Sequence, residues 1–473
     1  MMGRTSGHGC VMLSAFTTVC ALGALLVIPG QAVAQGTTER QVVFTKDIAP
    51  ILQRSCERCH RTNGVAPMPL TSYDQVRPWA RAIQRKTAAR EMPPWYIEKN
   101  IGIQRFKNDP SLTDEEIAKI ARWVDSGAPR GNPADMPPSR RYSDDGEWTI
   151  GTPDLIVSSP VITVKAVAPD WYAMLGPSQS GLAENRYIEA VEIREVRLDG
   201  AGMGRVEGRK EGDLSYFTVH HAGIHEVHPL EDPEGITRAF ARDGVGDGNF
   251  YIVHQLGANA TVYPSDTGVV LKAGAEFTYS VHMHSIGKEA KVRIDVGFKF
   301  RPRDWTPKYK QDTFVLMGNL TDELDIPANQ DNVRFDVFYR LPKAGLLTTY
   351  EPHMHSSGKR MCVEALYPDG KREMLNCSGY NHNWVLVYSY EEDVIPILPK
   401  DTVLHIIGWY NNTASNPRTI EPRNTKVHGQ RSIDDMLIFQ PRITWLTEEQ
   451  FKEQIAEREA QRRRRSSTAG AQQ

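Results

Sequence analysis

Several stretches of the chain after residue 150 alternate apolar and polar residues with a period of two, which predicts β-structure for this part. The alternation is clearest in three stretches: Lys291 to Phe300, Val333 to Tyr339, and Trp384 to Tyr390. Frequent Gly and Pro residues interrupt such stretches, which favours antiparallel sandwiches over βαβ units. Because about 300 residues exceed the size of one such sandwich, we expect two, over residues 151–310 and 311–446.

The N-terminal part contains the motif Cys56-x-x-Cys59-His60. Two thiols one helical turn apart can each add to a vinyl group of a haem, and the adjacent imidazole can then ligate the iron. A thioredoxin-like redox pair would explain the two cysteines, but not the histidine that follows them. The motif therefore predicts one covalently bound haem c.

Helical signals flank this motif on both sides. Residues Asp47 to Leu52 have the form of a capped helix start with a proline in the first turn. Thr113 and Glu116 have the spacing of a capping box, and apolar residues then recur at helical spacing until Gly127. We therefore expect one helix that runs into the motif and a second helix well downstream of it.

This region resembles small bacterial c-type cytochromes, in which a Met-Pro-Pro loop supplies the sixth iron ligand just before a C-terminal helix with a Trp-Val pair. Here the loop begins at Met92 and the pair is Trp123-Val124. The resemblance implies a small all-α haem domain over residues 36–130 with Met92 as the distal ligand, while Met68 is the competing candidate. A thioether opposite a histidine raises the haem potential, which suits electron transfer. A Pro-rich linker is expected over residues 131–150.

The chain begins with a targeting segment. Residues 1–34 combine a weakly positive start, an apolar run and the small-residue site Ala32-Val33-Ala34, as in a secretory signal peptide. The alternative is an uncleaved anchor, which would attach the protein to a membrane. We expect a periplasmic or secreted protein, in which Cys362 and Cys377 pair as a disulfide between consecutive strands; two unpaired thiols are the alternative. The net charge of −2 gives no broad positive field for nucleic acid.

Histidines cluster in the β region as three groups. They are the adjacent pair His220-His221 and two His-x-His motifs, His282-x-His284 and His353-x-His355. In a strand, residues two apart face one side, so His-x-His can present two imidazoles to one metal ion. An adjacent pair needs a bulge or a strand end to do so. The groups favour copper or zinc, and a cupin-type jelly roll with one metal remains an alternative.

The order of these groups resembles the copper type II monooxygenases, the family of peptidylglycine α-hydroxylating and dopamine β-monooxygenases. The resemblance covers about residues 150 to 445 and implies two jelly-roll-like domains with one copper each. The implied first-domain ligands are His220, His221 and His282. The implied second-domain ligands are His353, His355 and Met436. A soft thioether favours Cu(I), the form that binds oxygen, so the second set is the expected catalytic site.

What the resemblance implies is a monooxygenase that uses O2 to hydroxylate a C–H bond of an unknown organic substrate. The haem would relay electrons to the coppers from an external donor, either an ascorbate-like reductant or a redox protein. A peptide C-terminus is an unexpected substrate, because Glu351 and Gln440 stand where the peptide-amidating enzyme has a substrate-binding arginine and a tyrosine. The role of His284 stays open. So does a second class of function, a non-enzymatic haem and copper protein for electron transfer or copper handling.

The last 27 residues, 447–473, are highly charged and include the run Arg462 to Arg465. We expect a solvated helix followed by a disordered tail.

Overall fold

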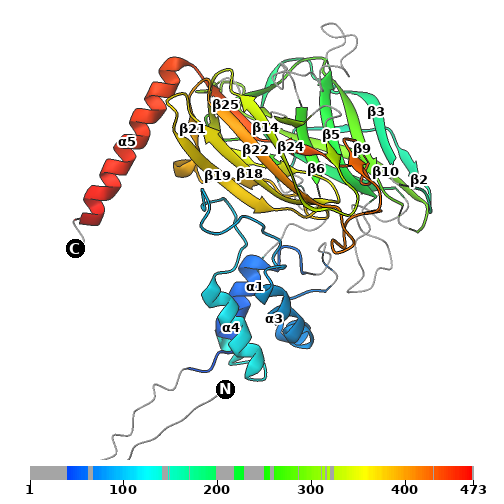
Figure 1. Cartoon of the computed structure of the whole chain (residues 1–473), viewed down its shortest axis with the longest axis vertical. Coiled ribbons are helices and arrows are strands. Elements are labelled where there is room, and N and C mark those ends of the chain that lie inside the picture. The colour runs from blue at the N-terminus through cyan, green and yellow to red at the C-terminus, as the bar shows by residue number, and fades with distance from the viewer. Residues whose placement is uncertain are drawn as a thin grey trace, which may run out of the picture. The chain divides into compact units, whose positions relative to one another are not determined.

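The structure is a computed structural model of the whole chain, shown in Figure 1. It describes residues 40–61, 66, 68–140, 148, 150–169, 171–198, 218–227, 250–255, 260–285, 287–309, 312–314, 317–319, 324–429 and 431–470. The side chains of His220 and His221, of strand residues 250–255 and of a few other strand and helix positions lie outside this description. So does the signal peptide expected over residues 1–34.

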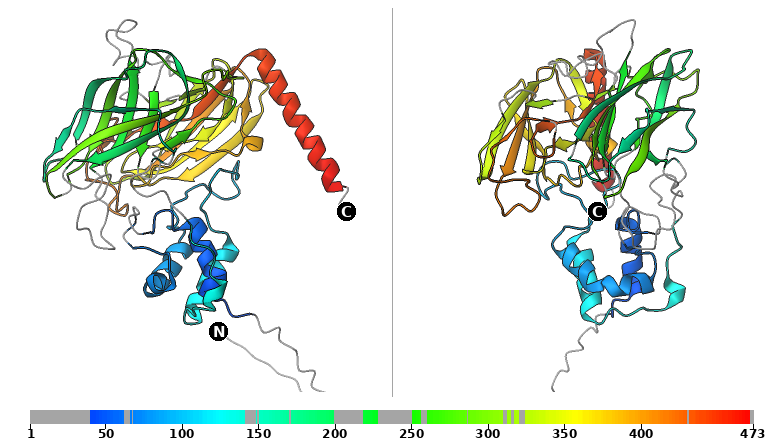
Figure 2. Two further views of the ribbon diagram at one scale, coloured as in Figure 1. Left: turned by 180° about the vertical axis from the view of Figure 1, so that it is seen from behind. Right: turned by 90° about the vertical axis from the view of Figure 1, so that its right-hand side faces the viewer.

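The first part of the described chain is helical, and its three longest helices group together (Figure 2). Its elements are η1 (Phe44–Ile48), α1 (Ala49–Ser55), α2 (Tyr73–Val76), η2 (Arg77–Trp79), α3 (Ala80–Ala88), α4 (Asp114–Asp125) and η3 (Pro133–Asp135). Their apolar faces share one small core, in which Trp123 is fully buried and packs near the ring of Phe44.

The capping box expected for the second helix is confirmed. The Thr113 side chain accepts the N–H of Glu116, the Glu116 side chain accepts the N–H of Thr113, and α4 follows. The helix start expected within Asp47 to Leu52 is confirmed for α1, which begins at Ala49 with Pro50 in its first turn, but the expected cap is not, since no side chain caps this helix. The helical chain begins at Phe44, because Asp47 reaches back to the N–H of Val43 from inside the first turn and does not stand at the N-cap.

The described residues of the first β region form ten strands that are hydrogen-bonded in two sheets. The six-stranded sheet has the order β1-β10-β4-β7, with β2 also paired to β10 and β8 to β4; the four-stranded sheet has the order β3-β9-β5-β6. The strands are β1 (Leu155–Ser158), β2 (Ile162–Val164), β3 (Trp171–Gln179), β4 (Arg186–Arg197), β5 (Val219–Val227), β6 (Phe250–Gln255), β7 (Ala260–Val262), β8 (Val269–Leu271), β9 (Glu276–Met283) and β10 (Ala290–Phe300). One apolar core joins both sheets, for example through the rings of Phe277 and Phe298 at 5.4 Å.

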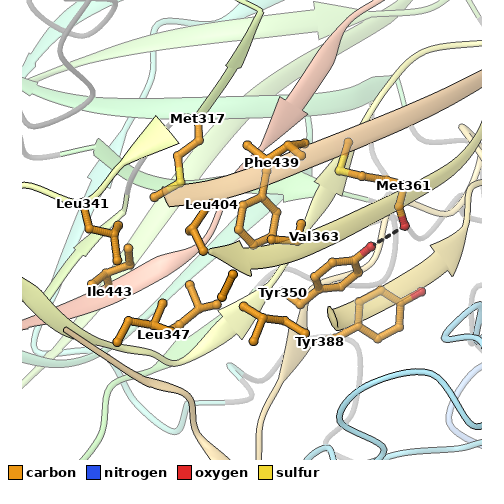
Figure 3. Close-up of a cluster of buried hydrophobic side chains, with 14 of the residues drawn as sticks. Met317, Leu341, Leu347, Tyr350, Met361, Val363, Tyr388, Leu404, Phe439 and Ile443 are labelled. Atoms are coloured by element: carbon orange, nitrogen blue, oxygen red, sulfur yellow. Dashed lines mark hydrogen bonds between the residues drawn. The ribbon is translucent and has the colours of Figure 1, made fainter. Parts of the chain in front are cut away.

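The second β region has its own core (Figure 3), in which Tyr350 donates a hydrogen bond to the Met361 carbonyl. Its four-stranded sheets are β14-β22-β18-β19 and β11-β25-β15-β21, and smaller sheets are β12-β24-β17, β13-β23 and β16-β20. The strands are β11 (Asp312–Phe314), β12 (Met317–Asn319), β13 (Asp325–Ile326), β14 (Asp331–Arg340), β15 (Ala344–Leu347), β16 (Thr349–Tyr350), β17 (Pro352–His353), β18 (Gly358–Leu366), β19 (Arg372–Gly379), β20 (Tyr388–Ser389), β21 (Ile397–Leu398), β22 (Val403–Asn411), β23 (Lys426–Val427), β24 (Leu437–Phe439) and β25 (Arg442–Leu446).

The expected β-rich, multidomain architecture with antiparallel sheets is confirmed, since every strand pair within the described residues is antiparallel. Two of the three alternating stretches form the long strands β10 and β14. The third is mostly wrong. Only Tyr388–Ser389 pairs as a strand, because the chain turns at Asn381, whose carbonyl accepts the N–H of Trp384.

The chain closes with a long helix and a short 3-10 turn that anchors it. The helix α5 (Glu448–Gly470) begins after Thr447, which caps the N–H of Gln450. Arg465 of α5 forms an ion pair with Asp393 of η4 (Glu392–Val394) at 2.5 Å. None of the helices in the described ranges combines the length and apolar character needed to cross a membrane.

Cys362 and Cys377 form the expected disulfide. They lie directly opposite each other in the register of β18 and β19, with 15 residues of sequence separation. Both cysteines are buried next to Ile407 in a small cluster separate from the main core, and the bridge ties β19 to β18.

We expect the Cys362→Ala/Cys377→Ala double variant to lose about 2–3 kcal/mol in the free energy of unfolding of this region, because closing a loop of this length restricts the unfolded chain. Denaturant unfolding measures the change. A reductant should destabilise the native protein by a similar amount and leave the double variant unaffected; equal stability of the oxidised native protein and the variant would contradict the prediction.

Candidate functional site

The Cys-x-x-Cys-His motif lies in a tight turn at the end of α1. The Cys56 carbonyl accepts the N–H of Cys59 at 3.1 Å and that of His60 at 2.9 Å. Cys56 and Cys59 form no disulfide with each other, and both are partly exposed. Burial of the sulfur and the neighbouring Cys59 raise the pKa of the Cys56 thiol to about 12, so it is protonated at neutral pH. The two sulfurs and the imidazole thus come from one short turn, as covalent attachment of a haem requires.

The His60 ring is fixed by one hydrogen bond. Its Nδ1 lies 3.1 Å from the Met68 carbonyl oxygen, and burial lowers the pKa of the imidazole. A neutral ring that donates from Nδ1 keeps a lone pair on Nε2, which is the form that ligates iron. The Met68 carbonyl is therefore the group that orients the expected proximal ligand, His60. Met92 and Met68 are both half-buried.

The second-domain residues expected to bind copper are brought together by a short ladder. Strand β17 pairs with β24 so that His353 faces Ile438 and Pro352 faces Phe439. Met436 directly precedes β24, and the N–H groups of Met436 and His355 both donate to Oδ1 of Asp435. The rings of His353 and His355 lie 5.5 Å apart, and all three side chains are buried. Imidazoles on one metal, each about 2 Å from it, have ring centres at a similar separation.

His355 is oriented for a ligand. Its Nδ1 lies 3.3 Å from the Asp434 carbonyl, whereas its buried Nε2 has no hydrogen-bond partner among the described residues. Burial first, and the charge of His282 second, lower the pKa of His355 to about 4, so the ring is neutral at pH 7. A neutral imidazole with one anchored nitrogen and one open nitrogen is suited to a metal. This donor set therefore fits copper.

One carboxylate, that of Asp435, joins the two halves of this site. Asp435 is fully buried and accepts the N–H of His355 at 2.8 Å and that of Met436 at 2.9 Å through Oδ1. Its Oδ2 accepts the N–H of Ser357 at 3.0 Å and also the Ser357 hydroxyl. Burial raises the pKa of this carboxyl to about 6, against the hydrogen bonds that lower it, so it is mainly ionised at pH 7.

The first-domain histidines lie on β5 and β9. His221 is paired with His282 in the ladder, and the register shifts between Val219 and His221, so His220 occupies the irregular position that an adjacent pair needs. The rings of His282 and His284 lie 5.2 Å apart. The side chains of His220 and His221 lie outside the described residues, so the expected trio of His220, His221 and His282 stays a prediction.

Among the described residues, no group of three or more His, Cys, Asp or Glu side chains is arranged to hold a metal ion. The expected second-domain site has only two residues of these types, His353 and His355, because its third ligand is a methionine. In the expected first-domain site, the side chains of His220 and His221 lie outside the described residues. His225 belongs to none of the three histidine groups of the sequence. It is buried, and its Nε2 lies 3.1 Å from the Ser280 hydroxyl. Burial lowers the pKa of His225 to about 4.

Sequence reasoning missed two residues at the second-domain site. His382 is buried, its ring lies 5.4 Å from that of His355, and its Nε2 lies 3.3 Å from the hydroxyl of Ser432. Burial, followed by nearby histidines, lowers the pKa of His382 to about 3. No spacing rule links an isolated histidine to a motif 27 residues earlier. Asp435 precedes Met436, but sequence alone does not distinguish it from Asp434.

Glu351 and Gln440, which replace the substrate-binding residues of the peptide-amidating enzyme, are both buried. The N–H of Gln440 donates to the Glu351 carbonyl at 2.9 Å, so the backbones of these two positions are neighbours.

No protein-family model matches the chain, and no curated protein matches it. Among solved structures, PNGF-II aligns with a TM-score of 0.26 and 10% identity. The alignment covers 62% of this chain and 65% of the PNGF-II chain. A two-domain protein of unknown function from Bacteroides fragilis aligns with a TM-score of 0.16 and 9% identity, over 61% of this chain and 94% of its own. The tandem CBM22 domains of Paenibacillus barcinonensis Xyn10C align with a TM-score of 0.16 and 9% identity. The alignment covers 64% of this chain and 96% of theirs.

We expect Asp435→Asn to lower the free energy of unfolding by about 2–4 kcal/mol and the affinity for copper by about 10- to 100-fold. The asparagine amide keeps one oxygen acceptor, but its NH2 group would face backbone N–H groups that the carboxylate accepts in the native protein. Asp434→Asn is the matched control, because the Asp434 carboxylate pairs with Arg431 at the surface and such pairs contribute about 0–1 kcal/mol. Thermal unfolding and copper titration measure both effects, and equal behaviour of the two variants would contradict the role of Asp435.

Proposed function

We propose that the protein is an exported, haem c- and copper-dependent monooxygenase that hydroxylates a C–H bond of an organic substrate with O2. The observation that carries the proposal is the buried His355 ring, whose Nδ1 is anchored while Nε2 stays open beside His353 and the Met436 segment. The resemblance to copper type II monooxygenases and to bacterial c-type cytochromes supports it through residue order.

The chain's own residues would hold three groups in this proposal. Cys56, Cys59 and His60, with Met92, would hold one haem c. His353, His355 and Met436 would hold one copper, and His220, His221 and His282 would hold the other. When bound, the haem would supply one-electron transfer, and the coppers would supply oxygen activation and a stored electron.

The protein contributes positioning at the second-domain copper site. The Asp435 carboxylate fixes the backbone of His355 and of Met436, and the Tyr410 hydroxyl donates to the Met436 carbonyl at 2.7 Å. The Tyr380 hydroxyl donates to the carbonyl of Met354, between the two histidines. These bonds hold the backbone around His355 and Met436, because β17 ends at His353 and β24 begins only at Leu437. Burial of the site excludes bulk water from the reacting groups.

We expect Met436→Ala to lower O2 consumption in the presence of an external reductant by more than about tenfold, because the site loses its soft ligand. Metal analysis should still find copper bound at the histidines. Met374→Ala, which removes a thioether from β19 of the same region, is the control. Unchanged O2 consumption in Met436→Ala, with two coppers bound, would favour the electron-transfer or copper-handling alternative.

The distal haem ligand can be tested separately. Met92→Ala should lower the haem reduction potential by on the order of 0.1 V, within the roughly 0.8 V range that axial ligands cover, and change the absorption spectrum. Met68→Ala should leave both nearly unchanged, since the Met68 contact with His60 is made by its backbone. The reverse pattern would show that Met68 is the ligand, and loss of covalent haem in Cys56→Ala tests attachment itself.

A further inference from the structure

The chain that follows Met92 leaves the helical core and docks on the second β region. We define the docking segment as residues 95–107. It extends the free edge of β19 in the sheet β14-β22-β18-β19, since Ile97 bridges Ser378 in antiparallel fashion. Backbone bonds of 2.9 Å flank this bridge, from Glu98 to the Cys377 carbonyl and from Gly379 to the Tyr96 carbonyl. Pairing of this kind fixes the position of the added segment, because the N–H and C=O groups at the edge of β19 form hydrogen bonds with it.

Side chains reinforce the docking segment along its length. The Glu98 carboxylate accepts hydrogen bonds from Nε and from Nη2 of Arg360, the latter at 2.8 Å, in a fork-like pair that favours a fixed geometry. The Trp95 ring packs edge-on against the buried Tyr388 ring at 4.7 Å. At the far end, Arg105 pairs with Asp393 at 2.6 Å.

One contact of the docking segment leads to the candidate copper site. The Asn381 side-chain amide donates to the Tyr96 hydroxyl at 3.0 Å, and the next residue is His382. The His382 ring lies 5.4 Å from that of His355, and its Nε2 contacts Ser432 in the segment before Met436. A continuous path of covalent bonds, one hydrogen bond and one ring contact therefore joins Tyr96 to His355.

The start of this path is close to the expected haem ligand. Tyr96 lies four residues after Met92, so the chain between them spans at most about 14 Å. Electron transfer through covalent bonds, hydrogen bonds and packed rings falls off less steeply with distance than transfer through space. The contacts just described lead from the docking segment into the second β region.

We propose that electrons from the haem enter the second β region directly, through Tyr96, Asn381 and His382 to His355, without first passing the His220/His221/His282 site. The inference rests on the proposed function. In each transfer Fe(II) gives one electron and becomes Fe(III), while Cu(II) at the His353/His355/Met436 site becomes Cu(I). An external one-electron donor then restores Fe(II). No proton or ligand needs to move along the path.

The test follows the haem and the copper directly. Full-length protein with Fe(III) haem and Cu(II) is mixed anaerobically with less than one equivalent of a one-electron reductant. Haem absorbance reports its reduction and subsequent reoxidation, and freeze-quench EPR reports loss of Cu(II). Tyr96→Phe, Asn381→Ala and His382→Phe should slow haem reoxidation, the last two at least about tenfold, which corresponds to about 1.4 kcal/mol in activation free energy.

Two controls locate the effect. Arg105→Ala removes another contact of the docking segment, away from His382, and should leave the reoxidation rate unchanged. In His220→Ala/His221→Ala, haem reoxidation should persist and should consume the remaining Cu(II) signal. Tyr96→Phe deletes one hydroxyl, so it keeps the test open if a larger replacement fails to fold.

The outcomes separate the inference from the proposed function. If the native protein shows no haem reoxidation by Cu(II), the proposal that haem supplies the coppers fails. If the native protein transfers the electron but all three path variants keep its rate, or if the His220→Ala/His221→Ala variant loses transfer, the direct entry is overturned while haem-to-copper transfer stands.

Discussion

The buried carboxylate of Asp435 is the interaction on which the candidate copper site depends. It accepts hydrogen bonds from the backbone of His355, Ser357 and Met436 and from the Ser357 hydroxyl. These donors come from segments about 80 residues apart in the chain. A buried anion is tolerated only when donors surround it. The hydrogen bonds of Asp435 can therefore form only when the segment of His355 and the segment of Met436 come together. The His-x-His motif and the methionine acquire a common location through it.

The site lies where regular sheet structure ends. Strands β17 and β24 pair over only two residues, and the ligands begin where the pairing stops. The longer sheet β14-β22-β18-β19 provides the rigid support, with the Cys362–Cys377 bridge inside it. Loops carried on a packed sandwich can hold polar and metal-binding groups that a strand interior would bury without partners. The free edge of β19 also gives the docking segment its place.

Local sequence signals were reliable where one local force dominated. The capping box at Thr113 formed because both of its bonds lie within four residues, and β10 and β14 follow their alternation because each has one face on a core. The stretch from Trp384 to Tyr390 alternates equally well but is mostly a loop, since its first residues turn back at Asn381. Alternation records which side chains are buried, and a loop that packs on a core shows it too.

The sequence by itself determined the Cys-x-x-Cys-His motif, the histidine groups, the antiparallel β architecture and the partnership of Cys362 with Cys377, because each depends on residue types and short spacings along the chain. Only the tertiary structure decided which distant residues support these groups. The roles of Asp435 and His382, and the docking of Tyr96 beside Asn381, depend on long-range burial and hydrogen bonding. Such contacts form when whole sheets pack, so no spacing within the sequence records them.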